Sequence, residues 1–374
     1  MRERMKIGII ANSLNPPRTG VGNVVYNVLK NIPKKTLSRN FYLINYEENG
    51  LFPESNKIII KNPFKKITKN FLWCQMLPLK NELNELDIIH NPYQLPTLFN
   101  FKQKYIMSIL DLIQILFPKE IKKSVYISQK IILSKSIQST DKIITISHHT
   151  KQDIIKHFKI PEDKIKVIHL AANENYKPLN ENEINKVKEK YNLNYPFILY
   201  VGTLEPRKNI PTLLKALYKI KKQGINHKLV ITGKKGWKYK SIFETIEKLN
   251  LQKDVIFTGY VPDEDLPALY NAADLFVYPS LYEGFGLPPL EAMACGTPVI
   301  TSNTSSLPEV VGDAGIMVNP YDVDELAKAM YEVLTNDGLR EELSKKGLER
   351  AKLFSWKKCA EEHLKVYEEV YNMK

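Results

Sequence analysis

The sequence predicts an α/β protein made of two Rossmann-like domains, each built around a parallel sheet. Short apolar runs alternate with stretches of helical periodicity, which is the pattern of βαβ units with buried parallel strands. The alternation forms two series, and polar residues together with Pro178 interrupt it at 173–182. Two domains of ordinary size fit the 374 residues. We therefore expect an N-terminal domain over residues 1–175 and a C-terminal domain over 176–355.

Each expected strand is a short run rich in Ile, Val, Leu, Phe or Tyr, as buried strands are. The N-terminal series comprises Lys6–Ala11, Phe41–Tyr46, Lys57–Lys61, Asp87–His90, Lys104–Leu110, Lys142–Ile146 and Lys164–Leu170. The C-terminal series comprises Phe197–Gly202, Lys228–Gly233, Val255–Gly259, Leu275–Pro279, Val299–Ser302 and Gly315–Val318. An amphipathic stretch from Val21 to Ile32 predicts the first helix.

Composition and apolar-run length exclude several classes of protein. Hydrophobic residues make up 43% and charged residues 25% of the chain, which argues against a disordered, collagen-like or coiled-coil protein. The longest apolar stretch, 106–117, contains Asp111 and Gln114 and is shorter than the roughly 20 residues of a bilayer span. The first residues lack the apolar core of a signal peptide. The three cysteines lack metal-ligand spacing. We therefore expect a cytoplasmic protein.

The net charge of +13 is unevenly distributed. The first 178 residues hold 28 Lys and Arg against 14 Asp and Glu, whereas the remainder holds 26 against 27. This asymmetry predicts that the N-terminal half meets an anionic partner, such as a membrane surface, a phosphate-bearing substrate or a nucleic acid. A nucleic acid is not expected, because no recognition helix, zinc finger or aromatic RNA-binding signature is present. If the partner is the anionic inner face of the plasma membrane, we expect a peripheral membrane protein.

Ligands of open α/β sheets bind beyond the carboxyl ends of the strands, so the loop after the first strand is a candidate site. In this loop, Gly20 and Gly22 would let backbone N–H groups approach an anion at the start of a helix. Val25 stands where a dinucleotide fingerprint has its third glycine, so NAD or FAD binding is not expected. The loop alone is equally compatible with a structural turn.

Two cations follow the first strand of the C-terminal series. That strand ends at Gly202, and Arg207 and Lys208 are expected to open the next helix. Two cations beside helix-start amides suit a diphosphate, since Arg can contact two oxygens at once. The alternative, a surface pair near a helix end, is less favoured.

A pair of carboxylates follows a later strand of the same series. Glu283 stands at the strand's carboxyl end, and Gly284 and Gly286 predict a tight turn before a helix begun by prolines. Glu291 follows early in that helix, so both carboxylates can face one cleft. They can accept hydrogen bonds from sugar or ribose hydroxyls, while the amides of the turn meet phosphate.

These motifs resemble those of the retaining glycosyltransferases of family 4, also called group 1, and among them a mannosyltransferase-like subgroup. The spacing of Glu283 and Glu291 and the segment Gly202–Asn209 carry the resemblance. It implies the GT-B fold, with two Rossmann-like domains facing each other across a cleft. The C-terminal domain would hold a nucleotide-sugar donor and the N-terminal domain the acceptor. A final helix, about 356–374, would cross back onto the N-terminal domain.

The resemblance also implies roles for single residues. Glu283 would bind the donor sugar and Glu291 the ribose, while Arg207 and Lys208 would hold the diphosphate and stabilise the leaving nucleotide. Asp111 would belong to the catalytic set. The remaining expected donor contacts are Gly20, Gly22, Gly202, Gly233, Tyr260, Phe285, Gly286 and Leu287.

One position departs from the pattern of the resembling enzymes, many of which carry a His before the Asp that follows an N-domain strand. Here Leu110 precedes Asp111, and leucine donates no hydrogen bond. His148 and His149, after the next strand, are candidates to replace that contact, although histidines near a strand end are more often polar surface residues. Trp73 is interpreted as a packing residue, with contact to the acceptor as the alternative.

The resulting expectation is an enzyme that moves mannose from GDP-mannose, with retention, to a glycan or lipid-linked acceptor in cell-surface polysaccharide or glycolipid assembly. No cofactor or metal is expected. The strings Asp263–Asp265 and Asp322–Asp324 resemble metal-binding motifs, but each precedes a helical run in which Asp can cap free N–H groups. The alternatives are a catalytically impaired transferase-like subunit that binds sugar nucleotides, and a GT-B epimerase or phosphorylase.

Overall fold

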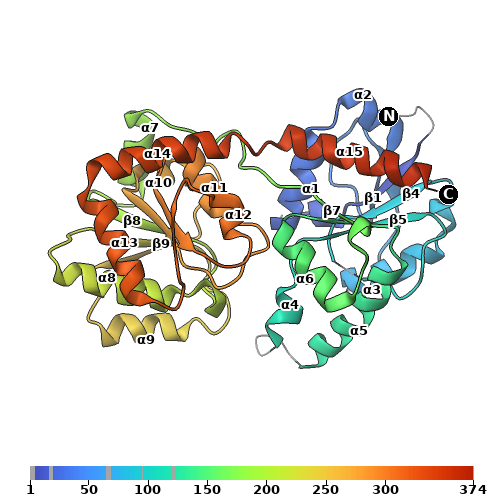
Figure 1. Ribbon diagram of the computed structural model, residues 1–374. Helices are drawn as coiled ribbons and strands as arrows, with labels where there is room; N and C mark the ends of the chain where they lie inside the picture. Colours follow the sequence, from blue (N-terminus) through green and yellow to red (C-terminus); the bar gives the residue numbers. More distant parts are fainter. Residues whose placement is uncertain (1–4, 17–19, 65–68, 95, 119–122, 374) are drawn as a thin grey trace. The chain divides into compact units, whose positions relative to one another are not determined.

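The computed structural model describes residues 5–16, 20–64, 69–94, 96–118 and 123–373 and divides into two compact units (Figure 1). Unit 1 comprises Met1–Leu170 together with Trp356–Lys374, and unit 2 comprises Ala171–Ser355. No helix within the described ranges is both long enough and apolar enough to cross a membrane.

Unit 1 is built around a parallel sheet of seven strands in the order β3-β2-β1-β4-β5-β6-β7. The strands are β1 (Ile7–Ile10), β2 (Phe41–Asn45), β3 (Asn56–Ile59), β4 (Ile88–Asn91), β5 (Lys104–Ile109), β6 (Lys142–Thr145) and β7 (Ile165–Val167). Strand β1 pairs with both β2 and β4, so the strand order reverses at β1. Such a reversal opens a crevice at the carboxyl ends of the strands.

The helices of unit 1 follow the strands in sequence. They are α1 (Gly20–Lys30), α2 (Lys34–Asn40), α3 (Lys69–Met76), α4 (Ile113–Leu116), α5 (Lys123–Ser139), α6 (His148–Phe158) and α15 (Trp356–Asn372). The interior of this unit includes Trp73, which is fully buried. The Trp73 indole Nε1 donates to Ile60 O at 2.8 Å, and its ring packs edge-on against Tyr46. Trp73 is therefore a packing residue.

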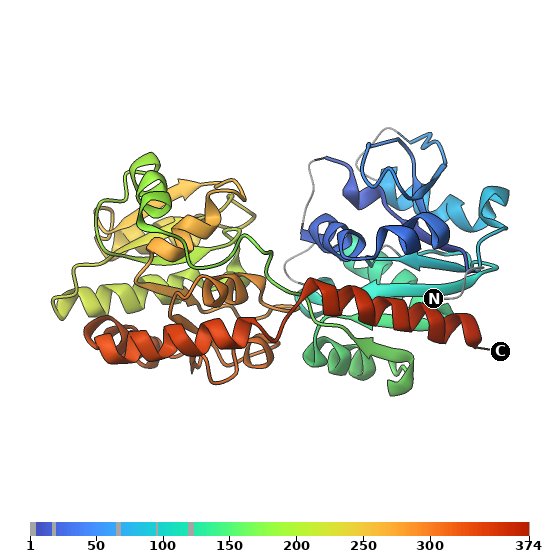
Figure 2. The ribbon, with the colours of Figure 1, turned by 90° about the horizontal axis from the view of Figure 1, so that it is seen from above.

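The C-terminal helix α15 lies beside α1 and belongs to unit 1 (Figure 2). The Tyr367 hydroxyl lies 2.8 Å from Nδ1 of buried His90, and the other ring nitrogen lies 2.9 Å from Ser108 Oγ. Lys142 Nζ donates to the Glu369 carboxylate at 2.5 Å. These contacts tie the end of the chain to strands β4, β5 and β6.

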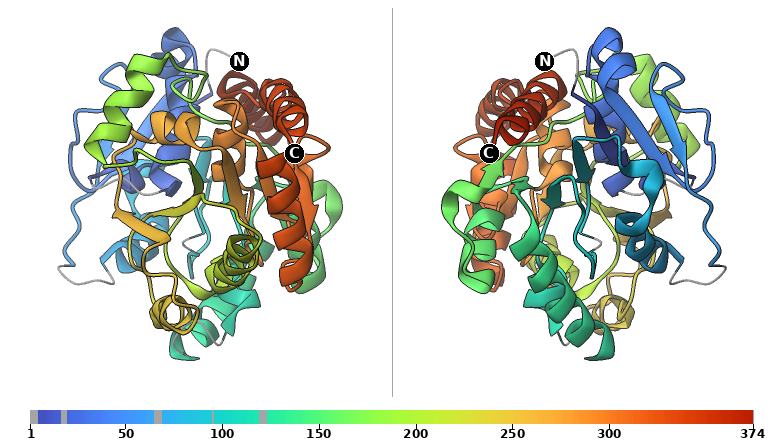
Figure 3. Two further views of the ribbon diagram at one scale, coloured as in Figure 1. Left: turned by 90° about the vertical axis from the view of Figure 1, so that its left-hand side faces the viewer. Right: turned by 90° about the vertical axis from the view of Figure 1, so that its right-hand side faces the viewer.

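Unit 2 is built around a parallel sheet of six strands in the order β10-β9-β8-β11-β12-β13. The strands are β8 (Phe197–Val201), β9 (Lys228–Thr232), β10 (Val255–Gly259), β11 (Leu275–Tyr278), β12 (Val299–Ser302) and β13 (Ile316–Val318). The helices are α7 (Glu181–Lys190), α8 (Ile210–Lys222), α9 (Lys240–Lys248), α10 (Leu266–Ala272), α11 (Leu287–Ala294), α12 (Leu307–Val311), α13 (Val323–Thr335) and α14 (Asp337–Ala351). They cover both faces of the sheet, with α8 against α13 and α11 against α14 (Figure 3).

The expected pair of parallel sheets is thus confirmed, and the strand order of unit 2 reverses between β8 and β11. The two Asp-x-Asp strings differ in their contacts. Asp322 caps α13, because its Oδ1 accepts from the backbone N–H groups of Asp324 and Glu325 at 2.9 Å. Capping was the wrong interpretation for Asp265, whose carboxylate instead accepts from Lys190 Nζ at 2.6 Å and the Tyr191 hydroxyl at 2.7 Å.

Candidate active site

The reversal point of unit 2 brings the ends of β8, β9 and β11 together. Gly202 and Gly233 follow β8 and β9, and their backbones are in direct contact. A Cβ on Gly233 would lie 2.1 Å from Gly202 O, and the residue has a φ of 146°, so only glycine fits there. This close approach shapes the backbone that leads to Arg207 and Lys208.

Arg207 and Lys208 lie in a short 3-10 turn, Pro206–Lys208, rather than opening α8 as the sequence suggested. Asn209 separates the turn from α8 and adopts a left-handed conformation with a φ of 56°. Its side-chain amide donates to Pro279 O at 3.1 Å and to Pro320 O at 2.7 Å. Asn209 therefore anchors the turn beside the end of β11, where the carboxylate motif begins.

Glu283 is the centre of the cluster and is 8% exposed. One carboxylate oxygen, Oε1, accepts from Lys208 Nζ at 2.6 Å, from Arg207 NH1 at 3.0 Å and from Ser280 Oγ at 2.6 Å. Burial opposes ionisation of this group, but the two cations outweigh it and lower the pKa of Glu283 to about 2. Glu283 is therefore an ionised carboxylate at any physiological pH.

The two cations have further acidic or polar partners. Arg207 NH2 pairs with Glu205 at 2.6 Å, and NH1 also donates to Tyr282 O at 3.0 Å. Burial disfavours the guanidinium charge, but Glu283 and Glu205 outweigh it and raise the pKa of Arg207. Lys208, only 6% exposed, also donates to the Tyr278 hydroxyl at 2.5 Å. Two carboxylates thus balance two cations in a largely buried site.

Two serines that sequence reasoning missed hold the backbone around Glu283. Ser305 Oγ accepts from the Glu283 N–H at 2.9 Å. Ser306 Oγ lies within hydrogen-bond distance of Glu283 O, at 2.9 Å, and of Phe285 O, at 2.6 Å. Both serines follow β12, the strand next to β11, and this position after a strand end was the only sequence signal that could have found them.

The turn after Glu283 leads into α11 as the sequence predicts. Gly286 precedes the helix with a φ of 118°, a conformation that favours glycine, and Leu287 is the first helical residue. Phe285 is buried, and its ring packs edge-on against Phe354 at 5.8 Å between centroids. Phe285 is therefore a packing residue, and its side chain is not suited to contact a donor directly.

Glu291, on α11, has a different environment from Glu283. Its Oε2 accepts from the Tyr270 hydroxyl at 3.0 Å. Burial of the carboxylate raises the pKa of Glu291 to about 7, and the hydrogen bonds from Tyr270 and Tyr176 only partly oppose the shift. Near neutral pH this carboxyl group is therefore close to half protonated. Tyr260, expected near the base, is exposed after β10 and lies under the Lys234 ammonium.

The expected residues of unit 1 follow two different strands, β1 and β5. Gly20 begins α1 and Gly22 lies buried within its first turn, while 17–19 of the preceding loop lie outside the described residues. Asp111 follows β5, and its Oδ1 accepts from the Ile113 N–H at 3.1 Å at the start of α4. Leu110, next to it, is half-buried.

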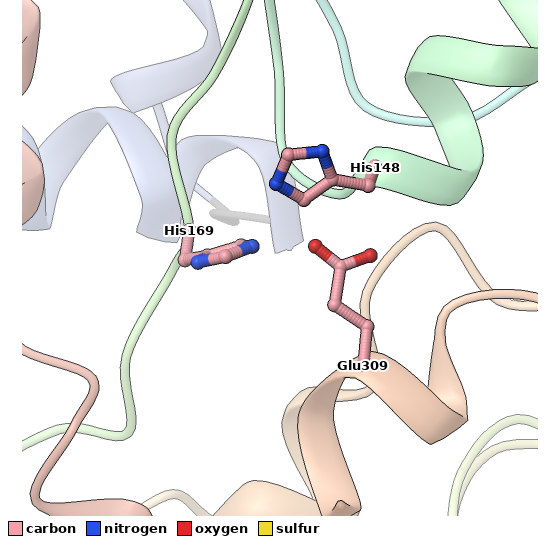
Figure 4. A group of neighbouring side chains, drawn as sticks. All are labelled: His148, His169 and Glu309. Atoms are coloured by element: carbon pink, nitrogen blue, oxygen red, sulfur yellow. The ribbon is translucent and has the colours of Figure 1, made fainter.

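The two histidines considered as substitutes lie at the start of α6. Ser147 caps this helix, because its Oγ accepts from the Thr150 N–H at 3.1 Å. The exposed His148 ring lies 5.9 Å from that of His169, which follows β7, and Figure 4 shows both rings. His149 Nε2 lies 3.5 Å from the Asp153 carboxylate.

Two family models match this chain, one in each half. Residues 18–175 match the family model described as Glycosyltransferase Family 4, and residues 181–350 match Glycosyl transferases group 1. The chain is 43% identical over 237 residues to an O-antigen chain mannosyltransferase B of Escherichia coli, covering 63% of this chain and 62% of the relative. It is 28% identical over 366 residues to an uncharacterized glycosyltransferase of Methanocaldococcus jannaschii, covering 94% and 95%. A serotype-specific mannosyltransferase of Escherichia coli is 38% identical, and the match spans 60% of this chain but only 28% of that relative.

Solved structures share the fold. A sucrose-phosphate synthase from Thermosynechococcus elongatus has a TM-score of 0.78 at 22% identity, covering 98% of this chain and 99% of that one. HepE of Anabaena, solved with UDP and glucose, has a TM-score of 0.75 at 19% identity, covering 97% and 99%. These likenesses confirm the expected GT-B fold class. Because the two models together span nearly all of residues 18–350, the chain belongs to the group 1 glycosyltransferases, the family that the motifs around Arg207 and Glu283 resemble.

Proposed function

We propose that this protein transfers mannose from GDP-mannose, with retention of configuration, to a glycan or lipid-linked acceptor in cell-surface polysaccharide or glycolipid assembly. The observation that carries the proposal is the buried cluster of Glu283, Arg207 and Lys208 at the reversal point of the unit 2 sheet. The mannosyltransferase names of two relatives favour mannose as the sugar. Because these matches cover only part of each relative, the sugar, the nucleotide and the acceptor are proposed for this chain.

In this proposal, Arg207 and Lys208 bind the diphosphate of the donor. Both cations are already fixed by protein contacts, so they need little reorganisation when negative charge develops on the leaving nucleotide. Preorganised charge of this kind is commonly the largest contribution to catalysis. The donor's phosphates would take over part of the pairing that Glu205 and Glu283 now supply. The acceptor hydroxyl would then enter on the face from which the diphosphate leaves.

Glu283 would orient the donor sugar. Its carboxylate is ionised and uses Oε1 for Lys208, Arg207 and Ser280. The other oxygen, Oε2, would accept hydrogen bonds from sugar hydroxyls. Glu291 would accept from the ribose hydroxyls, with Tyr270 fixing the orientation of its carboxyl group. Both contacts are of the charge-assisted kind, which is the stronger class of hydrogen bond.

One experiment distinguishes a transferase from two other activities, those of a phosphorylase and an epimerase. Purified protein is incubated with GDP-mannose, UDP-glucose and mannose-terminated acceptors, and free nucleotide and glycan products are measured. Nucleotide release that depends on acceptor supports the transferase, and the anomeric signal of the product by NMR reports retention. A phosphorylase would require inorganic phosphate, and an epimerase would change the sugar nucleotide without acceptor. Donor binding without turnover would support an impaired subunit, the alternative that Leu110 favours.

An anionic membrane surface is the partner we propose for unit 1. The excess of positive charge lies there, because unit 1 holds 31 Lys and Arg against 17 Asp and Glu, whereas unit 2 holds 23 against 24. On α5, exposed Ile127 and Ile131 are accompanied by exposed Lys130 and Lys135. These spacings place the four residues on one face of the helix. Apolar side chains among lysines suit the interface of an anionic bilayer.

A further inference from the structure

The last residue of β11, Tyr278, directly contacts one cation of the unit 2 cluster. Its hydroxyl lies 2.5 Å from Lys208 Nζ, which also donates to Glu283 Oε1 at 2.6 Å. Tyr278 is 1% exposed and Lys208 is 6% exposed, so both ends of this contact are buried. As one more residue of a buried strand, Tyr278 carries no sequence signal of a functional role.

The hydrogen bonds of Lys208 determine how its ammonium group is oriented. An ammonium has three N–H donors and no acceptor. Tyr278 and Glu283 accept from two of these donors, and the third has no hydrogen-bond partner among the described residues. The donors are arranged tetrahedrally about Nζ, so a group held at two of them has its third N–H direction fixed. With Glu283 alone, the ammonium could still rotate about its Cε–Nζ bond.

The Tyr278 hydroxyl is a neutral acceptor. Burial and the nearby Glu283 carboxylate raise the pKa of Tyr278 well above its ordinary value, so the hydroxyl keeps its proton. It therefore holds the ammonium without cancelling its charge. A carboxylate in the same place would give the cluster a third negative charge against its two cations. A neutral partner suits a cation whose charge is to act on a ligand.

Tyr200, on the neighbouring strand β8, offers an internal comparison. It is fully buried, and its ring stacks on that of Tyr278 with 5.8 Å between centroids and 20° between planes. The Tyr200 hydroxyl, in contrast, makes no hydrogen bond with the described residues. The two tyrosines share their packing, and contact with Lys208 distinguishes their hydroxyl groups.

We propose that Tyr278 is a positioning residue: its hydroxyl, together with Glu283, orients the Lys208 ammonium so that one N–H remains available to a phosphate oxygen. That this phosphate belongs to a sugar nucleotide rests on the proposed function. The orientation of Lys208 does not, because it follows from the two hydrogen bonds. Tyr278 acts through Lys208 and needs no contact of its own with the donor.

The test removes one hydroxyl at a time from the full chain. Tyr278→Phe deletes the contact with Lys208, and Tyr200→Phe is the matched control, since it deletes a buried hydroxyl that has no partner. Lysine labelled with ¹³C at Cε lets NMR follow the titration of Lys208, whose signal is identified by its absence from Lys208→Arg. The charged and titratable groups that act on this ammonium are Glu283, Arg207, Glu205 and Tyr278.

Tyr278→Phe should move the titration of Lys208 to lower pH. Burial already lowers the pKa of Lys208, and loss of an acceptor for the charged form would lower it further. Tyr200→Phe should leave this titration unchanged. A tyrosine that served only for packing would affect the thermal midpoint without affecting the titration, so the two roles are distinguished.

The kinetic effect of Tyr278→Phe should appear mainly in turnover. The rate of mannose transfer from GDP-mannose should fall at least about tenfold, which corresponds to one hydrogen bond to a charged group. GDP affinity should fall less, because negative charge on the diphosphate grows as the bond to the sugar breaks. The alkaline limb of the pH–rate profile should move in the same direction as the titration of Lys208.

The outcomes separate this proposal from the proposed function. An unshifted Lys208 titration in Tyr278→Phe would overturn the positioning role, as would an equal shift in Tyr200→Phe. In wild-type protein alone, a Lys208 Cε order parameter as low as those of surface lysines would also overturn it. A shift confined to Tyr278→Phe, in a protein that neither binds GDP nor transfers mannose, would keep the positioning role and reject only the transferase function.

Discussion

The Lys208 ammonium lies 2.6 Å from the Glu283 carboxylate, and both groups are buried. Removing Lys208 leaves Arg207 to balance the carboxylates of both Glu205 and Glu283, so the site keeps one uncompensated negative charge. Lys208→Met should therefore lower the free energy of unfolding by about 3–5 kcal/mol, and adding Glu283→Gln should recover much of the loss. Urea unfolding measures both. Lys219→Met, which removes an exposed pair with Asp324, is the control and should cost less than about 1 kcal/mol. Equal effects of the two lysine variants would contradict the buried pair.

Glu291 should make stability depend on pH. Its pKa is raised from 4.5 to about 7 in the folded protein, so the folded state keeps a proton that the unfolded chain releases. The stability that Glu291 gains from keeping this proton is fully present below pH 4.5 and declines as pH rises toward about 7. Glu291→Gln, which is neutral throughout, should unfold at a higher temperature than wild type at about pH 8.5 and at a similar temperature at about pH 4.5. A difference in unfolding temperature that is the same at both pH values would contradict a raised pKa for Glu291.

The ionisation of Glu291 should also control the affinity for the nucleotide of the donor. If ribose hydroxyls donate to ionised Glu291, GDP affinity should rise as pH passes through about 7. Loss of this charge-assisted bond in Glu291→Gln should weaken GDP binding by at least tenfold and remove the pH dependence. Calorimetric titration between about pH 6 and pH 8 gives both quantities. A wild-type protein with flat affinity over that range would argue against direct contact between Glu291 and the ribose.

Catalysis should not require a divalent metal ion. Arg207 and Lys208 supply positive charge where the diphosphate would lie. Mannose transfer should therefore continue in excess EDTA, and Arg207→Ala should lower kcat more than it weakens GDP binding. Activity that is lost in EDTA and restored by Mg²⁺ or Mn²⁺ would reverse this prediction.

Unit 1 should bind anionic vesicles in a salt-dependent manner. Screening acts over about 8 Å at physiological ionic strength, so binding should weaken as salt is added. Replacing Ile127 and Ile131 by Ser should weaken binding further, because these exposed side chains would insert between lipid headgroups. Vesicle sedimentation measures both effects. Equal binding to neutral and anionic vesicles would show that the lysines are only a solvated face.

The Leu110 side chain should make an apolar contact with the donor or acceptor, and its presence should not mean that the enzyme has lost a catalytic contact. Leu110→His should therefore add no activity, or lower it, because a polar ring would replace an apolar side chain at a half-buried position. Initial rates of mannose transfer, with circular dichroism to confirm folding, decide the matter. A large gain in rate would instead mark wild-type protein as an enzyme that has lost a catalytic contact.

Sequence periodicity was sufficient to predict both sheets, because buried parallel strands leave continuous apolar runs such as Phe197–Val201. The resemblance to group 1 glycosyltransferases likewise implied that Arg207, Lys208 and Glu283 would serve one site. It could not show that all three meet at Glu283 Oε1, since that contact joins two loops that follow different strands, β8 and β11. Local reasoning also misassigned Asp265, whose partners lie on or next to α7. Contacts between distant segments, rather than local pattern, were the part that could not be predicted.

The return of α15 to unit 1 has a consequence for how the protein is made. Strand β4 carries His90, and its partner Tyr367 follows the whole of unit 2 in the sequence, so it is translated only after unit 2. Unit 2 is continuous in sequence and can complete its fold while the chain is still being extended. Unit 1 begins before unit 2 in the sequence but is completed after it, and it exposes the apolar surface that α15 covers until that helix has been translated.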